Sequence, residues 1–219
     1  MVNRRSIVAT FLIAAYDAAT KSWGVAVQSR FLAAGSVVPW ARAGIGAVAT
    51  QALANPRYGP LGLAMLEQEI PADEVVSGLI GGDGGRELRQ VGVVDRTGRA
   101  AAFTGNECLP WAGHIIGDGF CCQGNILAGE AVVGAMARAI EHRSDLPFAE
   151  RLIAVLGAGQ AAGGDCRGQQ SAALLVVRAH GGIGGYSDRA IDLRVDDHST
   201  PIAELQRLLG LHRETFGNS

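Results

Sequence analysis

Cysteine is scarce in this sequence. Only four cysteines occur among 219 residues, no two of them form a C-x-x-C pair, and the five histidines stand apart from them. Structural zinc sites need closely spaced thiol and imidazole ligands, so no metal site is expected. Four thiols also do not make a disulfide framework in a chain of this size. We therefore expect a reducing, cytoplasmic location and no cofactor.

Charged residues are also few. They make up 18% of the chain, the formal net charge is −2, and no basic stripe or block of like charge occurs. Proteins that bind nucleic-acid backbones or anionic membrane surfaces carry such basic clusters. We therefore expect neither nucleic acid nor membrane as a partner, and expect a small-molecule substrate instead.

Proline is rare as well, with 7 residues against 31 glycines. Glycines scattered at this level are typical of many tight turns rather than of a low-complexity linker. Apolar residues reach 48%, a composition that excludes extensive disorder and supplies a core. Because no internal repeat and no linker divides the chain, we interpret residues 1–219 as a single domain.

The N-terminus imitates a secretory signal peptide. Arg4 and Arg5 precede an apolar run over residues 7–15, which is the order that such signals show. Residues 23–27, however, are predicted to be the hairpin partner of this run, and removing the run would leave that strand unpaired. We therefore interpret the run as a strand of the folded protein.

Short apolar runs bounded by turn residues predict a series of strands. They cover residues 6–16, 23–29, 36–40, 45–51, 90–94, 99–104, 114–116, 120–123, 171–177 and 190–195. Helices are predicted over 55–68 and 71–81, along apolar stripes over 132–140 and 148–156, and from residue 201 onward.

The order of these elements indicates the fold class. Short turns join neighbouring strands, and only antiparallel pairing allows such connections. Several strands are apolar on both alternations, so both of their faces have to be covered. Two stacked antiparallel sheets with helices outside satisfy both conditions. The expected fold class is therefore α+β.

Several segments, in order along the chain, resemble one protein family. They are 9–17 (ATFLIAAYD), 23–29 (WGVAVQS), 35–40 (GSVVPW), 46–51 (GAVATQ), 55–60 (NPRYGP), 123–125 (QGN), 164–172 (GDCRGQQSA) and 194–198 (RVDDH). Together they are similar to an uncharacterised bacterial and archaeal family, domain of unknown function 1028. The resemblance implies the fold of N-terminal-nucleophile (Ntn) hydrolases, a four-layer αββα sandwich. It leaves the reaction and the substrate open.

That fold implies a mechanism in which a Thr, Ser or Cys becomes the first residue after processing. Its side chain attacks an amide, and its freed α-amine, with a pKa of about 8, serves as the base. Thr10 opens the matching segment after the small residue Ala9, so it is the candidate nucleophile of an amide-cleaving hydrolase. Ser29 and Arg30 would lie beside it, where they could orient the nucleophile and lower the pKa of the amine. Equally, Thr10 could be an ordinary strand residue and Arg30 a surface arginine.

Uncharged polar side chains end two of the apolar strands. Thr50 and Gln51 close one strand, and Gln123 and Asn125 close the other. Amide groups in these places suit the recognition of an amide or a carboxylate, although they could equally cap turns. Backbone N–H groups of residues 43–46 could bind an oxyanion, and the same segment could be a plain turn.

The glycine-rich segment 163–171 carries Asp165 and Arg167. Arg167 could bind a substrate carboxylate bidentately, so we assign both residues to substrate binding; a buried structural bond between them is the alternative. Strand ends from both sheets of a sandwich meet at one rim. We therefore expect one pocket to be shared by Thr10, Ser29, Gln51, Asn125, Asp165 and Arg167.

Three alternatives remain. The segment 196–198 (DDH) resembles a metal site, but adjacent side chains on a strand point to opposite faces, which favours capping and strand termination. Cys122 is an alternative nucleophile with His114 as its base, or else a buried small apolar residue. The rival from another class is a non-catalytic binding or assembly protein on the same fold. In either class we expect a homo-oligomer.

Overall fold

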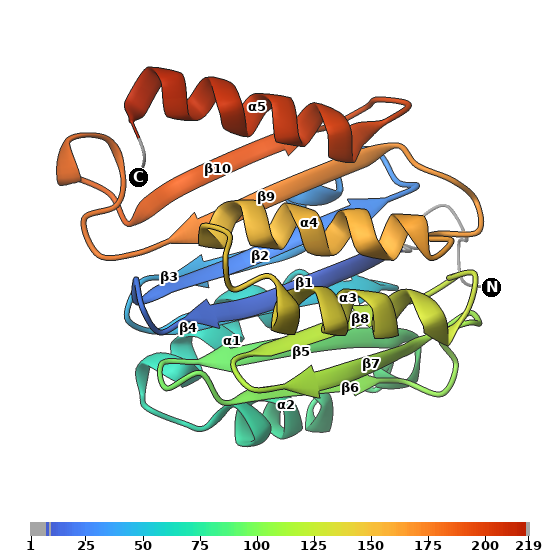
Figure 1. The fold of residues 1–219 in the computed structure, drawn as a ribbon. Helices are drawn as coiled ribbons and strands as arrows, with labels where there is room; N and C mark the ends of the chain where they lie inside the picture. Colours follow the sequence, from blue (N-terminus) through green and yellow to red (C-terminus); the bar gives the residue numbers. More distant parts are fainter. Residues whose placement is uncertain (1–7, 9, 218–219) are drawn as a thin grey trace.

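Two antiparallel sheets form the centre of the structure, a computed structural model that describes residue 8 and residues 10–217 (Figure 1). In the described part of the chain the larger sheet has six strands, in the order β10-β9-β2-β1-β8-β7. Their bounds are β1 Thr10–Asp17, β2 Ser22–Ser29, β7 Gly113–Gly117, β8 Phe120–Gly124, β9 Ser171–Val177 and β10 Arg189–Val195. The smaller sheet has the order β3-β4-β5-β6, with β3 Pro39–Arg42, β4 Gly46–Ala52, β5 Arg89–Asp95 and β6 Ala100–Thr104.

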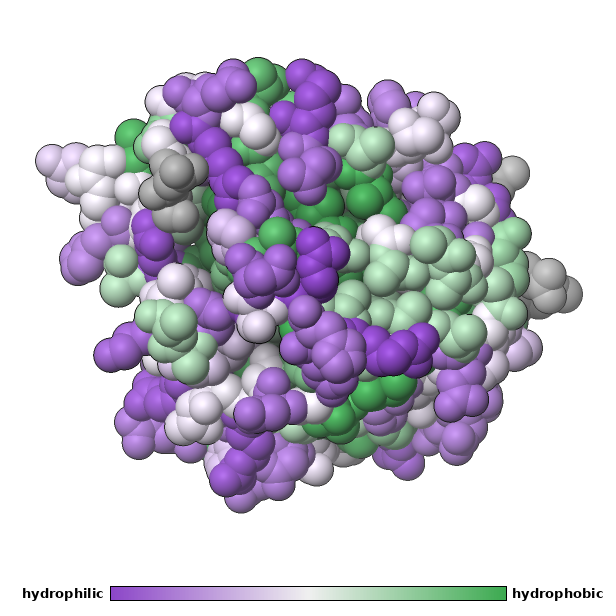
Figure 2. All heavy atoms as spheres, in the orientation of Figure 1, coloured by the Kyte–Doolittle hydropathy of each residue, from purple (hydrophilic) through white to green (hydrophobic). Residues whose placement is uncertain are grey.

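Helices cover the outer face of each sheet (Figure 1). The smaller sheet carries α1 Tyr58–Glu67 and α2 Ala72–Gly81; the larger one carries α3 Glu130–His142, α4 Phe148–Ala161 and α5 Pro201–Phe216. On the face shown in Figure 2, hydrophobic side chains gather around α3 and α4 among hydrophilic ones. None of the helices in the described residues is both long and apolar enough to cross a membrane. The predicted α+β class and the four-layer αββα arrangement are confirmed.

Strand β1 shows why the apolar run near the N-terminus has no polar side. Phe11 and Ile13 belong to the core between the larger sheet and its helices, whereas Leu12 and Ala14 belong to the core between the two sheets. Side chains alternate along a strand, so a strand that is covered on both faces needs apolar residues at successive positions. Residues 10–15 of the run therefore belong to a central strand.

The first predicted strand begins later than expected. Regular pairing starts at Thr10, and Val8 instead makes an isolated bridge to Ala52 at the end of β4. Residues 6, 7 and 9 of the predicted strand lie outside the described residues.

Two other boundaries differ from the prediction. The prediction of a strand over 36–40 is wrong, because Ala34–Ser36 forms a short 3₁₀ turn (η2) and β3 begins only at Pro39. The Ser36 hydroxyl closes this turn by donating to the carbonyl of Ala33 at 2.8 Å. The helix predicted from residue 55 begins at Tyr58, since the Asn55 side chain first forms a turn by accepting the N–H of Arg57 at 3.2 Å.

The two sheets differ in width, which leaves β10 uncovered on one face. The edge strand β3 of the smaller sheet packs against β2 and β9, and β10 lies one strand further out. Asp192 and Arg194 on β10 stand opposite Leu175 and Ala173, which belong to the core between the sheets. Strand β10 therefore has an apolar face beneath α5 and a charged face that no strand of the smaller sheet covers.

Candidate functional site

Thr10 is the first residue of β1 and lies where the two sheets meet. Its hydroxyl donates a hydrogen bond of 2.5 Å to Oε1 of Gln51 on β4. Both side chains are fully buried, and they come from different sheets. The structure thus joins the predicted nucleophile to one of the predicted substrate-binding residues.

Gln90, the second residue of β5, is held by backbone carbonyls. Its Nε2 donates to the carbonyl oxygens of Gly124 and Gly113 at 2.9 and 3.2 Å, and to the hydroxyl of Thr104 at 3.0 Å. Because carbonyl oxygens only accept hydrogen bonds, the atom that faces them must be the amide nitrogen. The orientation of the Gln90 amide follows from these neighbours.

This orientation determines that of the amides around it. Gln90 Oε1 accepts hydrogen bonds from Nε2 of Gln51 at 2.7 Å and from Nδ2 of Asn125 at 2.9 Å. With its nitrogen turned to Gln90, Gln51 presents its oxygen to Thr10. The hydroxyl hydrogen of Thr10 is therefore directed at Gln51, and its oxygen keeps lone pairs for other contacts.

Asn125 follows β8 and contacts Thr10 through the backbone. Its N–H donates to the carbonyl oxygen of Thr10 at 3.0 Å. In an antiparallel strand the N–H and C=O of one residue face the same neighbour, so the backbone nitrogen of Thr10 is directed to the Asn125 side. Asn125 Oδ1 is buried and has no donor among the described residues. An unpaired buried acceptor costs about 1–3 kcal/mol, so a group that brings an N–H to it would be bound favourably.

The network extends to His114 on the edge strand β7. Thr104 Oγ1 lies 2.9 Å from His114 Nδ1. Burial lowers the pKa of His114 below its ordinary value of 6.5, because desolvation disfavours the charged ring. The groups that surround Thr10 are therefore connected to a neutral imidazole at pH 7.

The chain passes from one sheet to the other just before Thr10. Val8 exchanges two backbone hydrogen bonds with Ala52, with N···O distances of 2.7 and 3.0 Å. Thr10 itself pairs with Ser29 in the larger sheet. Ala52 has a left-handed backbone with φ 64°, which is uncommon for a residue with a side chain. Val8 is thus anchored directly beside the residue that follows Gln51.

A second polar cluster surrounds Asp83. Its carboxylate accepts hydrogen bonds from Arg89 Nε at 2.7 Å, the Tyr58 hydroxyl at 2.8 Å and Asn55 Nδ2 at 3.1 Å. The hydrogen bond from Arg89 is the main reason that the pKa of Asp83 lies well below its ordinary value of 3.8. Burial, together with the Asp83 carboxylate, raises the pKa of Tyr58.

This cluster holds the strand ends that present the amides. Arg89 immediately precedes Gln90, and its guanidinium also donates to the carbonyl oxygen of Leu53, two residues after Gln51. The ion pair between Arg89 and Asp83 is mostly buried. The segment 55–60 was one of those that resemble the family. We infer that it supports the ends of β4 and β5, which carry Gln51 and Gln90, and does not contact a substrate.

Ser29 lies directly opposite Thr10 in the pairing of β1 with β2, and it is fully buried. Arg30 is directed elsewhere. Its guanidinium donates to the carbonyl oxygen of Gln169 at 2.9 Å, and its backbone N–H lies 3.4 Å from an Asp165 carboxylate oxygen. Ser29 thus shares the face of Thr10, while Arg30 joins the β1–β2 hairpin to the glycine-rich loop.

Asp165 and Arg167 form the bond that the sequence left as an alternative. The guanidinium donates from Nε at 3.0 Å and from Nη2 at 2.7 Å to the two carboxylate oxygens. Asp165 also forms a backbone bridge with Leu127, two residues beyond Asn125. The pair therefore supports the segment that follows Asn125, and the Arg167 side chain remains 35% exposed.

Thr50 and residues 43–46 lie away from Thr10. Thr50 precedes Gln51 in β4, so its side chain faces the opposite side of the sheet, where its hydroxyl accepts the N–H of Asn55 at 3.3 Å. Residues 43–46 lie at the other end of β4, about 17 Å from Gln51 along the strand. They are too distant to present N–H groups to an oxyanion at Thr10.

Gln123 occupies the space between the sheets, one residue pair deeper than Thr10. It stands opposite Leu12 of β1 and opposite His114 of β7. Both polar atoms of its amide are buried and have no hydrogen-bond partner among the described residues. Gln123 therefore shares the face of Thr10 without joining the hydrogen-bonded network.

The alternative in which His114 serves as the base of a Cys122 nucleophile is wrong. In the register of β7 with β8, His114 stands opposite Gln123 and Ile115 stands opposite Cys122. The two side chains therefore project from opposite faces of the sheet. Burial raises the pKa of the Cys122 thiol well above its ordinary value, which keeps it protonated.

The segment 196–198 ends β10 and leads into α5, as the sequence favours. Asp197 accepts a hydrogen bond from Gln170 Nε2 at 3.0 Å, and His198 Nδ1 accepts the N–H of Thr200 at 3.0 Å. Within the described ranges, no group of three or more His, Cys, Asp or Glu side chains lies close enough to hold a metal ion.

Gln90 is the central residue that sequence reasoning missed. The signal was present, because Gln90 begins the apolar strand predicted over 90–94 just as Gln51 ends the one predicted over 45–51. Thr104 and Ala52 were also missed, since a single threonine or alanine at a strand end carries no distinctive signal.

Comparisons with known proteins agree on one family. The model of DUF1028, described as a family of unknown function, matches residues 10–205. The crystal structure of protein SPO2555 from Silicibacter pomeroyi, described with the same family, is similar to this chain at 32% identity. The match covers 94% of this chain and 89% of that one, with a TM-score of 0.85. No curated protein matches the chain.

Proposed function

Because this chain belongs to the family of unknown function DUF1028, we propose its reaction from the geometry around Thr10. It hydrolyses an amide (C–N) bond of a small polar molecule, as an N-terminal-nucleophile hydrolase with Thr10 as nucleophile. The observation that carries the proposal is the buried hydrogen bond from Thr10 to Gln51. It holds a strand-initial hydroxyl in one orientation at the junction of two sheets.

The base in this proposal is the α-amine that Thr10 gains when the Ala9–Thr10 bond is cut. Gln51 offers an amide oxygen, which is too weakly basic to take a proton from a hydroxyl. The backbone nitrogen of Thr10 is directed to the side of Asn125, whose Oδ1 has no donor in the described part of the chain. An amine at this nitrogen would lie beside its own hydroxyl, as the proposed mechanism requires.

Maturation then follows from the same groups. The Thr10 oxygen attacks the carbonyl carbon of Ala9, the C–N bond breaks, and the hydroxyl proton moves to the Thr10 nitrogen. Water hydrolyses the resulting ester and releases residues 1–9.

Turnover repeats this chemistry on a substrate. The α-amine takes the Thr10 proton as the hydroxyl attacks the substrate carbonyl, and it returns that proton to the leaving amine. Water then hydrolyses the acyl ester. Amide atoms of Asn125 and Gln123 that lack partners among the described residues suit a substrate that carries amide or carboxylate groups.

The test is intact mass and N-terminal sequencing of freshly purified protein. We expect wild type to lose residues 1–9 and to begin at Thr10, whereas Thr10→Ala keeps its full length. Thr50→Ala is the matched control, because Thr50 is equally buried but faces α1, and it should mature normally. Release of amine from a panel of N-acyl amino acids then measures hydrolysis, which only the matured proteins should show.

The second candidate is a non-catalytic binding protein on the same fold. It is favoured by the pairing of Arg167 with Asp165 and by the complete burial of Thr10. Wild type that keeps residues 1–9 and releases no amine from any substrate would favour this candidate. In that case Thr10→Ala would keep the length of wild type, lose only ligand affinity and, like wild type, form no product.

A further inference from the structure

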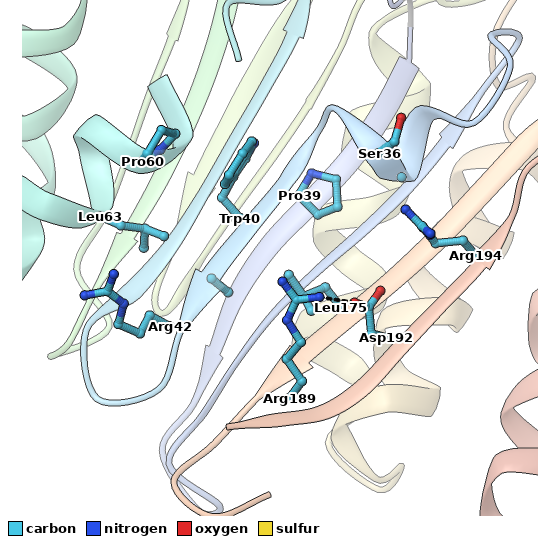
Figure 3. A pocket seen from close by; sticks show the side chains of 12 residues that line it. Ser36, Pro39, Trp40, Arg42, Pro60, Leu63, Leu175, Arg189, Asp192 and Arg194 are labelled. Carbon is cyan, nitrogen blue, oxygen red and sulfur yellow. Dashed lines mark hydrogen bonds and ion pairs between the residues drawn. The ribbon is translucent and has the colours of Figure 1, made fainter. Parts of the chain in front are cut away.

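The uncovered face of β10 borders a groove that is separate from the Thr10 network (Figure 3). Its volume is about 390 Å³, and its lining comes from η2, β3, α1, β9 and β10. Ligand sites for small molecules have volumes of about 300–1,000 Å³ and combine apolar walls with a few polar groups. None of the residues around Thr10 lines this groove.

Three arginines from two strands line the groove. Arg42 comes from β3, and Arg189 and Arg194 come from β10 (Figure 3). Arg189 is bonded to Asp192 at 2.5 Å, and Arg42 pairs with Glu67 at 2.9 Å. The second pair is about half exposed on both sides, so it holds Arg42 only weakly.

Arg194 is the arginine without a counter-ion. Within the part of the chain that the structure describes, its guanidinium has neither an ion pair nor a hydrogen bond. Its aliphatic stem lies against Gly35, where an added Cβ would be 3.0 Å from Cγ and Cδ of Arg194. The turn that carries Gly35 is tied to neighbouring strands, because the N–H of Ala33 donates to the carbonyl of Asp196 at 3.0 Å. The stem is therefore positioned while the charged end stays available.

The wall opposite Arg194 is flat and apolar. In Figure 3, Pro39 lies between Trp40 and Arg194. One face of the Trp40 indole is packed against Gly59 of α1, where an added Cβ would be only 2.2–2.4 Å from ring atoms. The indole nitrogen donates to the carbonyl of Val37 at 3.0 Å. These contacts fix the ring, and Leu175 of β9 completes the apolar lining.

We propose that this groove binds a small organic anion with a flat apolar body, an aromatic carboxylate. The carboxylate pairs with the guanidinium of Arg194, whose planar donors match two carboxylate oxygens. The ring lies over Pro39 and beside Trp40. Asp192 keeps Arg189 occupied and repels each negative charge of a ligand, which favours a monoanion over a dianion.

The test is calorimetric titration of the purified wild-type protein with 2-naphthoate, and with 2-naphthalenemethanol as the uncharged analogue. We expect saturable binding of one naphthoate, with the alcohol bound about tenfold more weakly or not at all. Arg194→Gln should weaken naphthoate binding about tenfold. Arg207→Gln is the matched control, because Arg207 is exposed on α5 outside the groove, and it should leave the affinity unchanged.

Asp192→Asn is an independent variant that acts in the opposite direction. Removal of the carboxylate frees Arg189 and removes the repulsion, so naphthoate should bind about threefold more tightly. Absence of saturable binding up to about 10 mM naphthoate would overturn the proposal. Equal affinity of wild type and Arg194→Gln, with both proteins folded by circular dichroism, would overturn it as well.

Discussion

Val8 and Ala52 exchange both of their backbone hydrogen bonds, and the pair lies two residues before Thr10 and one residue after Gln51. The chain upstream of the proposed nucleophile is thereby held by the smaller sheet, whereas Thr10 itself is held by the larger one. The relative position of the two sheets therefore determines the geometry on both sides of the bond that we propose is cut. Variants in either sheet should therefore affect maturation, although only the Thr10 hydroxyl is proposed to attack the bond.

Two replacements of Thr10 distinguish the contribution of its hydroxyl group from that of its branched side-chain shape. Thr10→Ser keeps the nucleophilic oxygen and should still lose residues 1–9, whereas Thr10→Val keeps the branched shape and should remain at full length. Amide hydrolysis by Thr10→Val should fall at least about a thousandfold, as expected when a nucleophile is removed. A time course of intact mass measures both variants. Maturation of Thr10→Val would contradict the assignment of the nucleophile.

Gln90 should be important for stability as well as for the site. Gln90→Met leaves the amide nitrogens of Gln51 and Asn125 and two backbone carbonyls without their buried partner. We expect the free energy of unfolding to fall by about 2–4 kcal/mol, measured by urea denaturation. Gln206→Met on the exposed side of α5 is the control and should change it by less than about 0.5 kcal/mol. Equal effects of the two variants would show that the network is not stabilising.

Asp83 makes stability depend on pH in a defined direction. Its folded pKa lies below the ordinary 3.8, so its contribution is complete above about pH 4 and is lost as the pH falls toward the folded pKa. Asp83→Asn should lower the free energy of unfolding by about 1–3 kcal/mol at pH 7, and the difference from wild type should shrink at pH 3. Asp145→Asn, in an exposed ion pair, should show no such change. A difference that stays constant from pH 7 to pH 3 would rule out the linkage.

Two glycines should respond oppositely to alanine. At Gly92 an added Cβ would lie 2.6 Å from Cys121 Sγ and 3.0 Å from Gln123 Oε1, between the sheets. Gly92→Ala should therefore destabilise the protein by about 1–3 kcal/mol. Gly157 lies within α4 and has open space around an added Cβ, so Gly157→Ala should stabilise by about 0.5–1 kcal/mol. Thermal denaturation of both variants measures the contrast; destabilisation by Gly157→Ala would indicate a neighbour at that face of α4.

Cysteine reactivity tests the alternative nucleophile. Burial raises the pKa of Cys121 to about 12 and that of Cys122 well above its ordinary value, whereas Cys166 is exposed. Iodoacetamide should therefore label Cys166 in the folded protein and leave Cys121 and Cys122 unmodified until urea is added. Peptide mass spectrometry identifies the labelled sites. Rapid labelling of Cys122 in native protein would revive its nucleophilic role.

Local chemistry explains which parts of the fold are predictable from the sequence. The β5–β6 hairpin was predicted because its turn is self-contained: Asp95 Oδ1 accepts the N–H groups of Thr97 and Arg99 at 2.9 and 3.1 Å. The strand predicted over 36–40 failed for the converse reason. Its apolar residues are buried by contacts with distant strands, whereas the backbone of Ala34–Ser36 forms a turn.

The candidate site was predictable only in its residue types. Amides at the ends of apolar strands indicated Gln51 and Asn125, and both meet Thr10 in the structure. Which end of a strand faces the nucleophile depends on the order and register of the strands in the sheet. Both depend on contacts between segments that are far apart in the sequence. For this reason an oxyanion role was considered for residues 43–46, although they lie at the far end of β4, and Gln90 was not recognised as the partner of Gln51.

The two sheets differ in how far apart their strands lie in the sequence, and this difference affects the order of folding. The smaller sheet with α1 and α2 comes from one continuous stretch, residues 39–104, whereas the larger sheet combines residues 10–29, 113–124 and 171–195. Contacts between neighbours in sequence form faster than contacts between distant segments. We expect the stretch 39–104 to acquire its structure early and the larger sheet to close late, when β8 joins β1. Thr10 meets Gln51 only when both sheets are present, so we expect the proposed nucleophile to acquire its buried hydrogen bond at the end of folding.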